Sequence, residues 1–186
     1  ESVKAGADVT LFSGDKLIGG PQSGIIIGRK TFVDIIRKHP LARALRVGKF
    51  TIAALEATLR LFLEPETLPQ RHPIIRMISR TYGELKQQAE TLQRRLSPLI
   101  DCEVIEGESA CGGGSLPDAV LKTSIVAMFQ KDIPAAELAK RLRLGDPTVV
   151  TRIQDDRVCI DVRTLLDGDD ERIVEAVRRV LHPAKT

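Results

Sequence analysis

The sequence contains no tryptophan, and aromatic residues make up only 3% of its 186 residues. We therefore expect an aliphatic core, and the scarcity argues against binding nucleic-acid bases on aromatic platforms. The chain also lacks Cys-x-x-Cys and His-x-x-x-His spacings, so we expect no metal site of the zinc type. Its three cysteines are widely spaced and odd in number, which favours reduced thiols and a cytoplasmic protein.

Long hydrophobic runs are missing as well. No run reaches about 18 apolar residues and no signal peptide is visible, so neither membrane insertion nor export is indicated. What is present, 42% hydrophobic and 28% charged residues, is typical of a globular domain. The net charge of +3 suits an anionic substrate but is too small to indicate nucleic-acid binding. Each of the three histidines precedes a proline, which predicts positions at element boundaries rather than in a catalytic site.

A glycine-rich turn over residues 13–22 carries Lys16 between two short apolar runs, at 9–12 and 25–27. Each run is too short for a helix, so each predicts a buried strand. An ammonium group held between buried strands is partly desolvated, and desolvation favours the neutral amine that attacks a carbonyl. Two interpretations of Lys16 stay open on these grounds, a solvated loop lysine and an amine for Schiff-base chemistry.

The segment over residues 41–49 is short and basic. Arg43 and Arg46 are three residues apart, so in a helical turn they would share one face. Two guanidinium groups on one face can clamp a phosphate-like anion. The alternative is a solvated cluster of surface charges.

Apolar residues at helical spacing predict a helix over 50–64 and a long helix over 71–98. Beyond Pro98 the pattern alternates between strands and helices and ends with a helix after residue 169, which predicts helices layered on an antiparallel sheet. The three glycines at 112–114 lack the lysine and Ser/Thr of a phosphate-binding P-loop, so we expect a turn there. For the adjacent Cys111 both a reactive role and a passive free thiol stay open.

Residues 13–28 closely resemble the segment that carries the pyridoxal-phosphate lysine in bacterial L-seryl-tRNA(Sec) selenium transferases, the selenocysteine synthases. The resemblance extends to residues 5–8, 39–47 and 51–61, about the first third of the chain. Beyond that it rests on the order of the elements and on residues 114–117. Gly48 departs from the pattern, because an acidic residue is expected there.

The resemblance implies an α/β fold, the C-terminal part of a fold type I pyridoxal-phosphate-dependent transferase. Residues 1–70 would then belong to the large cofactor-binding domain, 71–98 would form a linking helix, and 99–186 would form a small α+β domain with an antiparallel sheet. Further cofactor-binding residues and a tRNA-binding region would lie upstream of Glu1. The chain alone would consequently be inactive.

The activity implied by the resemblance converts seryl-tRNA(Sec) to selenocysteinyl-tRNA(Sec) with selenophosphate, in a homo-oligomer whose active site is shared between subunits. Lys16 would bind pyridoxal 5'-phosphate and act as general base, and Ser13 would contact the cofactor phosphate. Arg43 and Arg46 would bind the selenium donor. Two alternatives stay open, a related pyridoxal-phosphate lyase or transferase acting on a small amino acid or amino sugar, and a non-catalytic assembly module.

Overall fold

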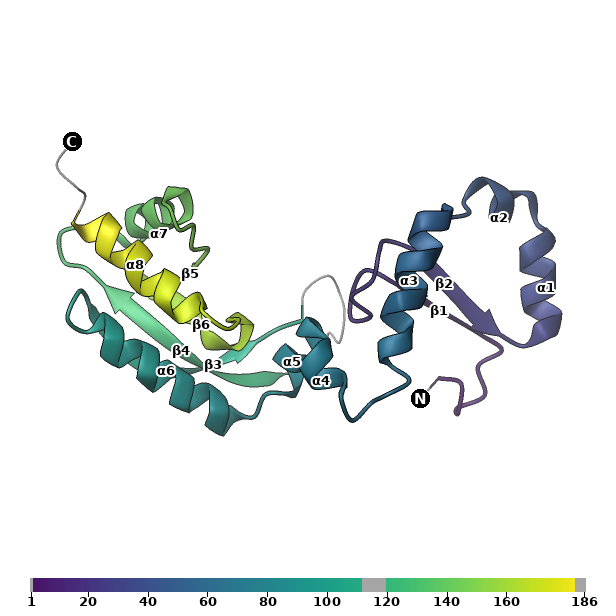
Figure 1. Ribbon diagram of the computed structural model, residues 1–186, viewed down its shortest axis with the longest axis horizontal. Helices are drawn as coiled ribbons and strands as arrows, with labels where there is room; N and C mark the ends of the chain where they lie inside the picture. The colour runs from purple at the N-terminus through teal and green to yellow at the C-terminus, as the bar shows by residue number, and fades with distance from the viewer. Residues whose placement is uncertain (1, 112–119, 183–186) are drawn as a thin grey trace. The chain divides into compact units, whose positions relative to one another are not determined.

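The computed structural model describes residues 2–111 and 120–182. The chain divides into two compact units, one that ends at Ser79 and one that begins at Arg80 (Figure 1). Among the described residues, no helix is long and apolar enough to cross a membrane. The two units are described in turn.

The N-terminal unit begins with an antiparallel pair of strands. Strands β1 (Val9–Ser13) and β2 (Gly24–Gly28) pair over their full length, which confirms the strands predicted on either side of the lysine turn. The helices that follow are α1 (Lys30–Lys38), α2 (Pro40–Ala44), α3 (Lys49–Leu61), α4 (Leu68–Arg71) and α5 (Pro73–Ser79). Helix α3 corresponds to the helix predicted over 50–64, and Pro40 opens α2 because proline tolerates the first helical turn.

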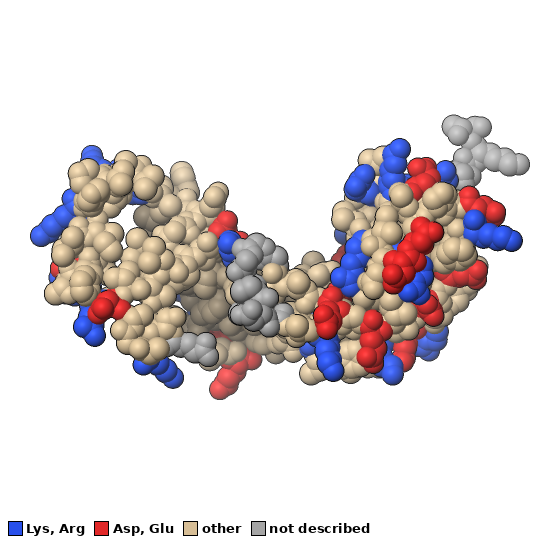
Figure 2. All heavy atoms as spheres, turned by 180° about the vertical axis from the view of Figure 1, so that it is seen from behind, with Lys and Arg blue, Asp and Glu red and all other residues tan. Residues whose placement is uncertain are grey.

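Very little of this unit is buried. Leu68 is the one buried apolar side chain among its described residues, and both strands are half-buried or exposed, so the prediction of two buried strands is wrong. Large apolar side chains stay in contact with solvent, among them Leu11 at 68%, Ile35 at 69% and Phe50 at 92% exposure. Figure 2 shows the visible face of this unit as largely uncharged. The apolar residues therefore lie in the expected strands and helix, but they do not form a core there.

The C-terminal unit is a layer of helices on a sheet. Its elements are α6 (Tyr82–Leu96), β3 (Asp101–Ser109), β4 (Leu121–Phe129), α7 (Ala135–Leu144), β5 (Arg152–Gln154), β6 (Arg157–Asp161), the 3-10 turn η1 (Val162–Thr164) and α8 (Asp169–Leu181). The strands pair antiparallel in the order β3-β4-β6-β5, which confirms the predicted antiparallel sheet. The glycines at 112–114 lie outside the described residues.

Almost all of the buried apolar side chains lie in this unit. Alternate residues of β4, such as Val126 and Met128, pack with α6, α7 and α8 in one cluster. The intervening Ile125 and Ala127 form a small separate cluster with Cys159 of β6. This alternation is the period expected when one face of a strand meets the main core.

The helix predicted over 71–98 is interrupted, so that prediction is wrong as a single element. Helix α5 ends at Ser79 and α6 begins at Tyr82, and Thr81 between them has extended backbone angles. The Thr81 hydroxyl accepts the Glu84 backbone N–H, and the Glu84 carboxylate accepts the Thr81 backbone N–H. This reciprocal capping box starts a new helix rather than continuing the old one.

Candidate functional site

The turn that carries Lys16 is closed by its own backbone. The Gly14 N–H donates to the Ser23 carbonyl at 2.9 Å, and the Gly20 N–H donates to the Gly14 carbonyl at 2.8 Å. Gly14 is buried, and a β-carbon there would lie 2.9 Å from the Pro21 carbonyl oxygen. The close approach explains why the chain needs a glycine at this point.

Lys16 itself is exposed. The prediction that buried strands would partly desolvate its ammonium group is therefore wrong, because those strands are half-buried at most. The Lys16 carbonyl accepts the Gly19 N–H at 2.8 Å, and Gly19 has a φ of +67° that favours glycine. The structure thus combines a defined backbone turn with an exposed lysine residue.

A cleft of about 1520 Å³ lies beside β1 and β2 within the same unit. Its walls are mainly the apolar side chains of both strands and of α1, α2 and α3, and the space-filling view shows this unit hollowed (Figure 2). The polar side chains at the cleft are Ser13, His39, Arg46 and Lys49. A hydroxyl and cationic groups in an otherwise apolar cleft suit an anionic ligand with a nonpolar body.

The cleft brings together Ser13 and Arg46, and neither Lys16 nor Arg43 is among the described residues that line it. Arg43 lies in the last turn of α2, which ends at Ala44, so Arg46 follows the helix instead of sharing its face. Sequence reasoning missed His39 and Lys49 as cleft residues. The basic run over 43–49 was the available signal for Lys49.

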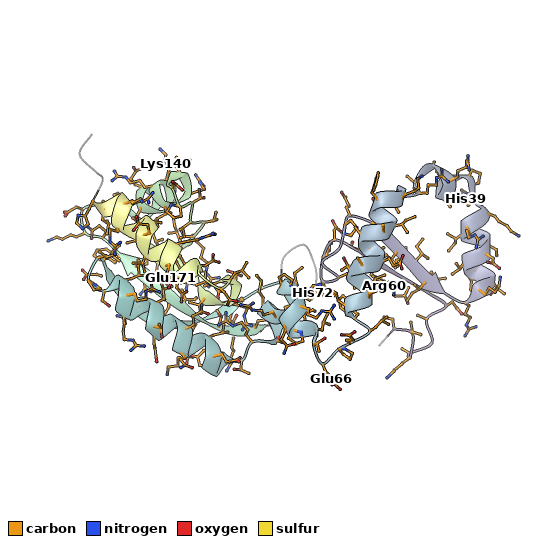
Figure 3. All side chains as sticks on the ribbon, in the orientation of Figure 1. His39, Arg60, Glu66, His72, Lys140 and Glu171 are labelled. Atoms are coloured by element: carbon orange, nitrogen blue, oxygen red, sulfur yellow. The ribbon has the colours of Figure 1, made fainter. Side chains whose placement is uncertain are left out.

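Two of the histidines occupy the predicted boundaries in different ways. His39 caps α2, because its Nδ1 accepts the Leu41 backbone N–H at 3.2 Å (Figure 3). His72 lies between α4 and α5 and is buried, with 3% exposure. Its ring contacts the lysine turn at Ile18, and no local sequence pattern predicted this contact.

The donor set fits a phosphorylated carbonyl compound such as pyridoxal phosphate. The primary amine of Lys16 can bind the carbonyl carbon and the Ser13 hydroxyl can bind a phosphate oxygen; of these two residues, Ser13 lines the cleft. Among the described residues, no group of three or more His, Cys, Asp or Glu side chains is placed to hold a metal ion.

Comparison with known proteins gives consistent results. A family model described as "SelA: L-seryl-tRNA selenium transferase" matches residues 1–166. The L-seryl-tRNA(Sec) selenium transferases of Maridesulfovibrio salexigens and Hyphomonas neptunium are each 44% identical to the chain, over 97% and 96% of it. The chain spans about 40% of the length of these relatives.

A solved structure titled "Structure of D-Glucosaminate-6-phosphate Ammonia-lyase" superposes on 96% of the chain with a TM-score of 0.64. The chain covers 45% of that protein, and the two sequences are 21% identical. At this level of identity the likeness concerns the fold, and it agrees with the predicted α/β fold class.

Proposed function

We propose, because this chain belongs to the L-seryl-tRNA selenium transferase family, that the complete enzyme containing it converts seryl-tRNA(Sec) to selenocysteinyl-tRNA(Sec). The selenium donor in this proposal is selenophosphate. The observation that carries the proposal is the family match over residues 1–166, which includes the Lys16 turn, the cleft and most of the C-terminal unit. Relatives with the printed name L-seryl-tRNA(Sec) selenium transferase support it at 40–44% identity.

We assign pyridoxal 5'-phosphate as the cofactor and Lys16 as the residue that binds it. When bound, this cofactor withdraws electrons from the α-carbon of an amino acid substrate. Lys16 Nζ supplies the amine, and the lysine is exposed in the described part of the chain. Ser13 supports the cofactor phosphate through its hydroxyl. Residues up to about 70 then belong to the cofactor-binding domain.

Lys16 also holds the proton that leaves the seryl α-carbon. A neutral amine accepts that proton at Nζ, and the ammonium that results is an acid for the departing hydroxyl group. The backbone of the lysine turn is held by the hydrogen bonds at Gly14, Gly19 and Gly20. A held backbone limits the positions that Nζ can reach, which favours a repeatable transfer.

Arg46 and Arg43 bind the anionic selenium donor. Arg46 and Lys49 both line the cleft, so these two cations can attract a phosphate-like group into it. Arg43 is exposed on the neighbouring helix α2 and assists from outside the cleft. The donor is thereby held in the cleft that Ser13 also lines.

The remaining groups of the site come from other segments or from a second subunit of a homo-oligomer. The described residues that line the cleft include no carboxylate to pair with a protonated pyridine nitrogen. The exposed apolar side chains of the N-terminal unit also favour contact with further protein surface. Both observations support a site shared between parts of a larger assembly.

The test is incubation of the complete enzyme with seryl-tRNA(Sec) and radiolabelled selenophosphate. We expect selenium in the aminoacyl group of the tRNA, no transfer with Lys16→Ala, and normal transfer with the control Lys38→Ala on α1. Absence of labelled tRNA, together with release of ammonia from a small amino acid or an amino sugar, would favour the alternative lyase. A complete enzyme that binds no pyridoxal phosphate would contradict both enzymatic interpretations.

A further inference from the structure

His72 is a buried histidine in contact with the turn that carries Lys16. The residue follows α4 and precedes α5 in the chain, and it is only 3% exposed (Figure 3). The Nε2 atom lies 2.8 Å from the carbonyl oxygen of Ile18, a residue two positions after Lys16 in the turn. The two partners are 54 positions apart in the sequence, so the contact is tertiary.

The second ring nitrogen determines the direction of that hydrogen bond. The Ile75 backbone N–H donates to His72 Nδ1 at 3.2 Å, so Nδ1 is an acceptor. In a neutral imidazole the other nitrogen then carries the proton. Nε2–H therefore donates to the Ile18 carbonyl. The Ile75 N–H of α5 favours this tautomer because it occupies Nδ1 as an acceptor.

Packing fixes the ring on two further sides. The Phe62 ring meets the imidazole edge-on, with centroids 5.3 Å apart and planes at 69°. On the side of the turn, a β-carbon at Gly19 would lie 2.7 Å from His72 Nε2. The turn and the ring thus fit directly against each other, with no space for a side chain at Gly19.

We propose that His72 is a positioning residue for Lys16. Backbone hydrogen bonds at Gly14, Gly19 and Gly20 close the turn internally. The bond from His72 to the Ile18 carbonyl connects the turn to the start of α5. Without this donor the half-buried Ile18 loses the hydrogen bond to its carbonyl, and the turn opens more often. The inference rests on the proposed function in one respect, that Lys16 is the residue that bears the cofactor.

The variants separate the hydrogen bond from the packing. His72→Phe keeps a ring against Phe62 and removes both nitrogens, whereas His72→Gln keeps an N–H donor near the position of Nε2. His182→Phe is the matched control, because His182 is an exposed histidine at the end of α8 in the other unit. All variants are made in the complete enzyme.

The first measurement is amide hydrogen exchange of the peptide covering residues 14–20, in enzyme without cofactor. We expect about tenfold faster exchange in His72→Phe, recovery towards the original rate in His72→Gln, and no change in His182→Phe. Peptides of the C-terminal unit serve as an internal check of global folding. If His72→Phe fails to fold, the comparison of His72→Gln with His72→Asn, whose shorter side chain does not reach Ile18, takes its place.

The second measurement is the rate at which the visible absorption of lysine-bound pyridoxal phosphate appears after mixing. We expect this rate to fall about tenfold in His72→Phe and to recover in His72→Gln, in parallel with exchange. Equal rates in all variants would overturn the positioning role, whether or not exchange changes. Failure of Lys16 to bind the cofactor in the unmodified enzyme would instead overturn the proposed function, so the two failures are distinguishable.

Discussion

At the scale of single residues, the lysine turn shows what a local pattern can and cannot predict. The glycines and the flanking apolar runs predicted a turn between strands, and Gly14 and Gly19 are needed there for close approach and for a positive φ. The exposure of Lys16 was not predictable, because it depends on how little else packs against β1 and β2. The His72 contact was not predictable either, since its partner is 54 positions away.

Arg46→Ala is expected to weaken binding of selenophosphate by the complete enzyme about tenfold, because it removes a charge-assisted hydrogen bond at the cleft. Arg43→Ala is expected to have a smaller effect, since Arg43 is exposed on α2 outside the lining of the cleft. The measurement is calorimetric titration with selenophosphate, with Arg37→Ala on α1 as control. Equal losses for Arg37→Ala and Arg46→Ala would indicate only a general charge effect.

At the scale of elements, the break between α5 and α6 follows from four residues. Threonine followed three positions later by glutamate is a helix-start pattern, and residues 81–84 contain it. Apolar spacing continues across the break, which is why periodicity alone predicted one helix over 71–98. Capping chemistry outweighs periodicity here because Thr81 and Glu84 satisfy each other's backbone N–H groups.

Thr81→Ala is expected to lower the free energy of unfolding by about 1 kcal/mol, because it removes the side-chain acceptor at the start of α6. Urea denaturation followed by circular dichroism measures the change. The control is Thr91→Ala in the middle of the same helix, where alanine is expected to be neutral or slightly stabilising. A loss in Thr91→Ala as large as that in Thr81→Ala would contradict the capping role.

Glu84→Gln tests the other half of the capping box through its pH dependence. Hydrogen bonds from the Thr81 backbone N–H and hydroxyl lower the pKa of Glu84 below its usual 4.5. A lowered pKa means that the carboxylate stabilises the fold above the unfolded pKa and loses this effect as the pH falls through the folded pKa.

The unmodified protein should therefore be more stable than Glu84→Gln at pH 7, and the difference should shrink steadily below about pH 4.5. Urea midpoints measured between pH 7 and pH 3 would show this. A difference that stays constant over the whole range would mean that ionisation of Glu84 does not contribute.

At the scale of the whole molecule, the apolar side chains are used differently in the two units. In the C-terminal unit they pack between three helices and an antiparallel sheet, and the order of strands and helices after Pro98 predicted that arrangement. In the N-terminal unit similar runs stay exposed, as at Leu11, Ile35 and Phe50. Periodicity indicates which face is apolar, but it carries no information about what covers that face.

Residues 80–186 are consequently expected to fold alone with a cooperative urea transition, because they contain nearly all of the buried apolar side chains. Residues 1–79 are expected to show no cooperative transition in isolation, since little apolar surface is buried there. Expression of the two pieces and denaturation followed by circular dichroism provide the test. A cooperative, stable 1–79 piece would contradict this account.

The most direct test of the central claim is to identify the lysine that binds pyridoxal phosphate. The complete enzyme is incubated with the cofactor, reduced with borohydride to fix any lysine adduct, digested and analysed by mass spectrometry. We predict the adduct on Lys16, and its loss together with the visible absorption in Lys16→Ala but not in Lys38→Ala. An adduct on a different lysine, or none at all in enzyme that still transfers selenium, would contradict the assignment of Lys16.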